Sequence, residues 1–101
     1  MVQRADFTTF ISLLRLDEPN VQNVQELADA WGTIRRELDE VGVDVQEAFA
    51  ALGEVDFVVI YEAPNGDAAF QADVVMERHG FNVQTLEATP TDRFADLVAD
   101  V

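Results

Sequence analysis

Apolar residues recur along the chain with two different spacings, one typical of strands and one typical of helices. Strand-like runs fall at residues 8–16, 43–52, 57–61 and 81–88. Residues 21–41 and 67–79 are instead apolar at every third or fourth position, which indicates two amphipathic helices. A shorter stripe of the same kind follows Pro90. The pattern therefore predicts the order strand, helix, strand, strand, helix, strand, with a terminal helix.

The strand at residues 57–61 is apolar or aromatic at every position, so both of its faces need cover. It belongs in the middle of a sheet, beside the equally apolar run 8–16. The run 43–52 is more polar and suits an outer position, and Gly53-Glu54 is predicted to close a tight hairpin. With right-handed crossovers, this order gives an α+β ferredoxin-like βαββαβ fold with a four-stranded antiparallel sheet and a C-terminal helix.

Capping residues set the predicted helix ends. Gly42 can adopt the left-handed conformation that ends the first helix. Asn65 or Asp67 starts the second, because either side chain can accept a hydrogen bond from the first turn. Thr89 is predicted to cap the last helix, with Pro90 at its first helical position. We expect this helix to dock on the body of the domain through Phe94, Leu97, Val98 and Val101.

Both faces of the predicted sheet are apolar at its centre. In the first strand, Phe10 and Leu14 alternate with Ile11 and Leu13, so apolar side chains point to both sides. Two helices and a tail can cover only one face. A large exposed apolar patch is rare on a monomer, and we therefore expect a face-to-face homodimer, or a higher oligomer built from such dimers.

Length and composition indicate a single soluble domain spanning residues 1–101. No apolar stretch approaches the ~18 residues needed to cross a bilayer, and the N-terminal sequence lacks the pattern of a secretory signal. We therefore expect a cytoplasmic protein that does not bind membranes. Cysteine is absent, which excludes disulfides, thiolate catalysis and iron–sulfur clusters.

The chain carries 20 acidic and 6 basic residues, and its formal net charge is −14. All six basic residues are arginine. The many carboxylates repel one another in dilute buffer, and molar salt screens this repulsion. The composition therefore predicts a halophilic source. The alternative is an acidic surface for a basic partner, although the acids are spread over every segment. Nothing resembles the basic stripe of a nucleic-acid-binding protein.

The stretch Gly53-Glu54-Val55-Asp56-Phe57-Val58, followed by Tyr61-Glu62-Ala63-Pro64, resembles the signature of the GYD-domain family of small prokaryotic proteins. Val55 stands where that family usually has an aromatic residue. The long first helix and the ending Leu86-Glu87-Ala88 are also similar, so the resemblance covers about residues 8–98. It implies the dimeric α/β-barrel type of the ferredoxin-like fold, which agrees with the expected two-sheet dimer.

Four residues are candidates for ligand binding. Asp56 could act as a base, but an aspartate beside a hairpin more often fixes the turn. Tyr61 could point into a cavity between two sheets or could be a core aromatic residue. Arg15 could bind an anion or pair with an acid on the neighbouring strand. His79 could be a ligand, although a histidine in the last helical turn more often answers the helix dipole.

The sequence predicts no metal site and no cofactor, because it lacks ligand pairs, phosphate loops and dinucleotide glycine clusters. Two functions remain open. One is a non-catalytic module for small-ligand binding or oligomerisation. The other is a cofactor-free or haem-dependent monooxygenase-like enzyme, which rests on fold analogy alone. A roomy cavity between sheets, lined by Tyr61 and Arg15, would favour ligand binding or catalysis.

The acidic composition predicts that stability depends on salt. Raising the ionic strength from about 0.01 M to about 1 M shortens the Debye length from about 30 Å to about 3 Å, which removes most repulsion between distant carboxylates. We expect the thermal unfolding midpoint to rise over this range, with sodium and potassium chloride acting alike. Acidification to about pH 4–5 should give part of the same gain. An unchanged midpoint would instead favour the basic-partner interpretation.

Overall fold

The structure is a computed structural model that describes residues 7–16 and 24–99. The elements are β1 (Thr8–Leu16), α1 (Val24–Glu40), β2 (Asp44–Ala50), β3 (Phe57–Ala63), α2 (Gly66–Arg78), β4 (Phe81–Ala88) and α3 (Thr91–Val98). None of the helices in the described ranges has the length and apolar character needed to cross a lipid bilayer.

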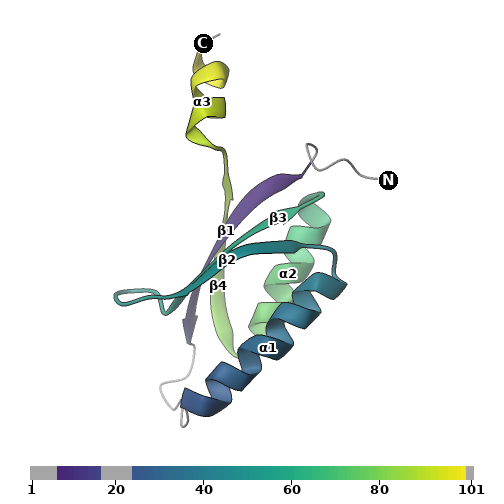
Figure 1. The fold of residues 1–101 in the computed structure, drawn as a ribbon, viewed down its shortest axis with the longest axis vertical. Helices are drawn as coiled ribbons and strands as arrows, with labels where there is room; N and C mark the ends of the chain where they lie inside the picture. Colours follow the sequence, from purple (N-terminus) through teal and green to yellow (C-terminus); the bar gives the residue numbers. More distant parts are fainter. Residues whose placement is uncertain (1–6, 17–23, 100–101) are drawn as a thin grey trace.

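The four strands form one antiparallel sheet in the order β2-β3-β1-β4 (Figure 1). The central places of β1 and β3 follow from their apolar character on both sides. Ile11 in β1 lies opposite Ile60 in β3 and Leu86 in β4, which fixes the register across three strands. The element order and the strand order confirm the ferredoxin-like α+β fold expected from the sequence.

Burial alternates along the central strands and distinguishes the two faces of the sheet. Leu14, Val59 and Tyr61 are fully buried, whereas their neighbours Leu13 and Val58 keep partial exposure. Helices α1 and α2 run side by side against the buried face (Figure 1). They contribute Ile34, Leu38, Ala72, Val75 and Met76 to the core. We call the buried side the covered face and the opposite side the open face.

Three aromatic rings pack together on the covered face. Trp31 of α1 has its ring centroid 5.1 Å from that of Phe57 and 5.8 Å from that of Phe81. Phe57 and Phe81 meet edge to face, with centroids 5.6 Å apart. Contacts of this kind add about 0.5–1.5 kcal/mol per pair beyond the burial of apolar area. The cluster therefore ties α1 to the strands β3 and β4.

The hairpin between β2 and β3 differs from the tight two-residue turn expected at Gly53-Glu54. β2 ends at Ala50 and β3 begins at Phe57, so a longer loop connects them. Its base is closed where the amide of Ala51 donates to the carbonyl of Asp56, 2.8 Å away. Gly53 still provides a positive φ of 125°, as expected for a glycine in a reversal. The sequence thus located the reversal correctly but predicted too short a loop.

Helix α3 also differs from expectation. It begins at Thr91, and Pro90 occupies the N-cap position without any side-chain cap from Thr89. Rather than docking on the body, α3 projects past the end of β4 (Figure 1), and its residues 91–98 are all exposed. Only Thr89 and Pro90 lie between β4 and α3, and proline restricts the chain direction at this link. Val101 lies outside the described residues.

Two predicted caps are confirmed. Gly42 adopts a φ of 91° just after α1 and donates its amide to the carbonyl of Asp39. At the start of α2, the side-chain oxygen of Asn65 accepts a hydrogen bond of 2.9 Å from the amide of Ala68. The second cap starts α2, which covers the face that holds Tyr61.

We expect Asn65→Ala to lower the free energy of unfolding by about 1 kcal/mol, because the amide of Ala68 loses its partner. Asn65→Asp is the matched control, since an aspartate keeps the acceptor and stays near the wild-type value. Urea unfolding of the three proteins in the same high-salt buffer measures the difference. Equal midpoints for Asn65→Ala and the wild type would contradict a stabilising cap.

Candidate functional site

Tyr61 lies on the covered face of β3 and is fully buried. Its ring stacks on Phe10 at a centroid distance of 5.8 Å. Its buried hydroxyl has no hydrogen-bond partner in the described part of the chain. Burial raises the pKa of Tyr61, and the nearby hydroxyl of Ser12 opposes only part of this rise. The phenol is therefore a neutral core group and does not face the open side of the sheet.

A chain of polar side chains crosses the covered face beside Tyr61. The hydroxyl of Thr85 in β4 donates to Oδ1 of Asp73 in α2 at 2.5 Å. The oxygens of Ser12 and Thr85 lie 2.7 Å apart. Because the Thr85 proton is used toward Asp73, the Ser12 hydroxyl donates to Thr85. Three buried or half-buried polar groups thus satisfy one another and join β1, β4 and α2.

Asp56 holds the β2–β3 loop against β1. Its Oδ2 accepts a hydrogen bond of 2.8 Å from the amide of Leu16, and its own amide donates to the carbonyl of Leu14 at 2.8 Å. The carboxylate therefore substitutes for a strand partner at the point where β3 begins. This geometry supports the turn-fixing interpretation of Asp56 over a role as a base.

His79 follows α2 and reaches α1. Its Nε2 lies 2.8 Å from Oε1 of Glu37, and Nη2 of Arg78 lies 3.7 Å from the same oxygen. The hydrogen bond to His79 lowers the pKa of Glu37. His79 consequently links the two helices on the outer side of the domain, away from the open face.

Arg15 is exposed on the open face, at the end of β1. It lines a small hollow of about 190 Å³ together with Leu13, Glu54, Val55, Asn82 and Gln84. Along β1, Arg15 shares its side with Ile11 and Leu13, whereas the residues that pack with Tyr61 point the other way. No cavity between two open faces can therefore be lined by both Arg15 and Tyr61, contrary to the arrangement considered from the sequence. The four candidate residues lie in four separate environments.

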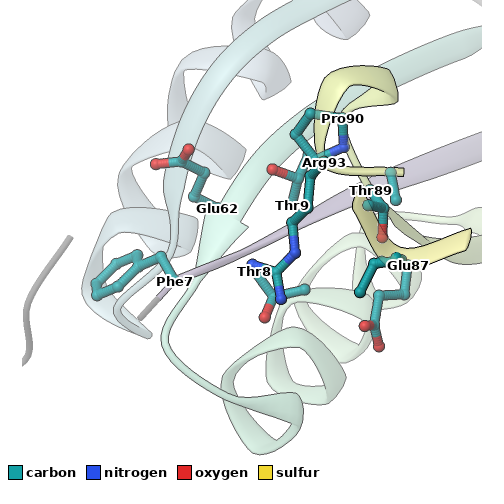
Figure 2. A pocket seen from close by; sticks show the side chains of 10 residues that line it. Phe7, Thr8, Thr9, Glu62, Glu87, Thr89, Pro90 and Arg93 are labelled. Carbon is teal, nitrogen blue, oxygen red and sulfur yellow. The ribbon is translucent and has the colours of Figure 1, made fainter. Parts of the chain in front are cut away.

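A larger hollow of about 420 Å³ lies where the sheet meets α3 (Figure 2). We call it the strand-end hollow. Figure 2 shows Arg93 reaching from α3 toward Thr8, with Glu62 and Glu87 on either side. The strand-end hollow is lined by Phe7, Thr8, Thr9, Glu62, Glu87, Ala88, Thr89, Pro90, Arg93 and Leu97. A guanidinium among hydroxyl and carboxylate groups suits a small polar molecule.

Sequence reasoning missed the strand-end hollow because its walls come from the ends of three strands and from α3, which are far apart in the chain. One signal was present. Arg93 is the single basic residue after Arg78 in an acidic chain. Among the described residues, no group of three or more histidine, cysteine, aspartate or glutamate side chains could hold a metal ion.

The open face carries two rows of apolar side chains across the sheet. One row places Phe49, Val58 and Leu13 on adjacent strands, and the other places Ile60, Ile11 and Leu86 beside one another. Phe49 is 52% exposed and Leu86 is 43% exposed. Helices α1 and α2 pack on the other face, so neither row is covered by them.

A family profile for the GYD domain matches residues 10–98, which include all the described strands and helices except the first two residues of β1. The chain belongs to the GYD domain family. No curated protein matches the chain. In this GYD domain the signature stretch at residues 53–58 forms the β2–β3 loop and the start of β3. Asp56 of the signature anchors that loop to β1, and Val55 lines the small hollow beside Arg15.

The polar chain on the covered face predicts a pH dependence. Burial raises the pKa of Asp73, and the hydrogen bond from Thr85 opposes only part of this rise. A raised pKa means that the folded state binds a proton more tightly than the unfolded state. The contribution of Asp73 to stability is therefore lost as pH rises from its ordinary value through the raised one.

We expect Asp73→Asn to remove this loss, since an amide oxygen can still accept from Thr85 and carries no charge. The difference in unfolding free energy between Asp73→Asn and the wild type should grow in favour of the variant as pH rises above about 4. Urea titrations at a series of pH values in about 1 M salt measure it, with other surface charges screened. A difference that does not change with pH would contradict this assignment.

Proposed function

We propose that this GYD domain is a self-associating module in which the open face of one copy packs on the open face of a second copy. The observation that carries the proposal is the pair of apolar rows on a face that α1 and α2 do not cover. An apolar patch of this kind on a sheet is ordinarily buried against another layer. A second identical sheet supplies that layer.

Two-fold symmetry doubles the apolar area that such a contact buries. In a two-fold dimer every residue of the open face contributes twice, once from each copy. Full burial of one large apolar side chain contributes about 1.5–3 kcal/mol, and the half-exposed Phe49 and Leu86 would gain a part of this. Six apolar side chains on each copy can together supply the free energy that holds a dimer.

The net charge sets the condition under which the dimer is stable. Two copies carry −28 in total, twice the −14 of one chain. Their mutual repulsion opposes association in dilute buffer and is screened at about 1 M salt, where the Debye length is about 3 Å. A halophilic origin would provide such conditions.

Small-ligand binding fits within the same arrangement. The hollow beside Arg15 opens on the open face and would be enclosed when a second sheet packs there. A guanidinium in an enclosed space suits a small carboxylate or phosphate. The placements of Tyr61 and His79 weigh against the oxygenase alternative. Tyr61 lies under the helices, and His79 contacts Glu37 on the outer side of the domain.

Two neighbouring residues of β3 test the proposal because they point to opposite faces. Ile60→Asp places a charge on the open face, so we expect a folded chain that sediments as a monomer at about 1 M salt while the wild type sediments as a dimer. Val59→Asp places the same charge in the core, where Val59 is fully buried. We expect it to lower the free energy of unfolding by roughly 3 kcal/mol or more.

Both variants add one negative charge, so a difference between them in sedimentation or stability comes from the face that the charge occupies and not from the net charge. The proposal is wrong if the wild-type chain sediments at 11.2 kDa in high salt. It is also wrong if Ile60→Asp remains as dimeric as the wild type.

A further inference from the structure

The apolar side of α3 is about half exposed, and one of its residues, Leu97, borders the strand-end hollow. Phe94 is 56% exposed, Leu97 is 51% exposed and Val98 is 44% exposed. Their spacing of three and four residues places them on one side of the helix. Ala95 and Asp96 lie on the other side, because successive residues are turned by about 100°. Helix α3 is therefore amphipathic, with its apolar side open to solvent.

The neighbouring part of the same chain does not suit this apolar side. The link from β4 consists of Thr89 and Pro90 alone, so the first turn of α3 stays within roughly 11 Å of the strand end. The surface there is the strand-end hollow, where Thr8, Thr9 and Glu87 present polar groups. Covering these with Phe94 and Val98 would remove polar groups from water without partners, which is unfavourable.

A membrane surface is also a poor partner for α3. The helix has eight residues and carries Asp92 and Asp96 as well as Arg93. The whole chain has a net charge of −14, so an anionic lipid surface repels it. A second copy is repelled too, but molar salt screens this repulsion, and a second copy also provides a large apolar face.

The open face and α3 are continuous. Thr9 and Glu62 point to the open face, as do their neighbours Ile11 and Ile60 two residues away. Both also line the strand-end hollow, together with Arg93 and Leu97 of α3. A copy seated on the open face is therefore within reach of α3, and in a two-fold dimer each α3 is within reach of the other copy.

We infer that α3, with Thr89 and Pro90, is an exchange arm that packs through Phe94, Leu97 and Val98 onto the second copy of the chain. This inference rests on the proposed self-association. In the exchanged dimer, the apolar side of α3 is buried in both copies.

The absence of cysteine makes a direct test possible. Asp96→Cys accepts a nitroxide spin label on the polar side of α3, and this spin-labelled chain is made without nitrogen-15. It is mixed with a wild-type chain that carries nitrogen-15 and no label, at about 1 M salt. We expect selective broadening of amide signals in the wild-type chain within roughly 20 Å of the arm. No selective broadening in that chain would overturn the exchange.

A second measurement compares Leu97→Asp with Ala95→Asp, which adds the same charge on the opposite side of α3. Because α3 is exposed in the single chain, both variants should fold. We expect Leu97→Asp to raise the dimer dissociation constant about tenfold or more and Ala95→Asp to change it less than about threefold. Equal effects of the two substitutions would overturn the inference.

The outcomes separate this inference from the proposed function. If Ile60→Asp breaks the dimer while Leu97→Asp does not, the sheet contact stands and the exchange arm is wrong. If Leu97→Asp breaks it while Ile60→Asp does not, the arm stands and the sheet contact is wrong. A wild-type chain that is monomeric at about 1 M salt refutes both.

Discussion

The two central strands are apolar on both sides, and the rest of the structure follows from this constraint. β1 and β3 pair along seven residues, from Thr8 opposite Ala63 to Leu14 opposite Phe57. One side of this pair is buried under α1 and α2, and the other keeps Ile11, Ile60 and their neighbours half-buried. A single layer of helices cannot cover both sides. The open face therefore keeps apolar side chains that α1 and α2 do not cover.

Several polar side chains in the domain form hydrogen bonds that join one element to another. Asp56 anchors the β2–β3 loop, His79 joins the helices through Glu37, and Thr85 joins β4 to Asp73 in α2. The contacts of Asp56 and His79 connect residues 40 and 42 positions apart, whereas Thr85 joins two consecutive elements. Asp56 and His79, two of the four candidate residues, therefore hold the fold, whereas Arg15 and Arg93 line hollows at the surface of the domain.

The sequence was sufficient to predict the fold because periodicity reports which side of an element is buried. The continuous apolar run of β3 identified a central strand, and the cap at Asn65 identified a helix start. The sequence predicted loop lengths less well, because these depend on contacts between residues that are far apart in the chain. β3 begins at Phe57 as predicted, but β2 ends at Ala50 and not at residue 52, so the loop is longer than Gly53 suggested. Asp56 at the end of this loop is bonded to β1.

The candidate site was harder to predict for a related reason. Period-two alternation places Tyr61 and Arg15 on faces, but it does not say which face the helices cover. The strand-end hollow depends on the direction in which α3 leaves β4, and an amphipathic stripe carries no information about its partner. Phe94 and Leu97 gave the same pattern that a docked helix would give, yet they remain exposed on the single chain.

Isotope-filtered nuclear Overhauser spectroscopy tests the central claim most directly. A sample mixing carbon-13-labelled and unlabelled chains at about 1 M salt reports only contacts between protons of different copies. We predict intermolecular signals from the methyl groups of Ile11, Ile60 and Leu86 on the open face, and none from the buried Val59. Intermolecular signals confined to the helices, or none from the open face in a confirmed dimer, would contradict it.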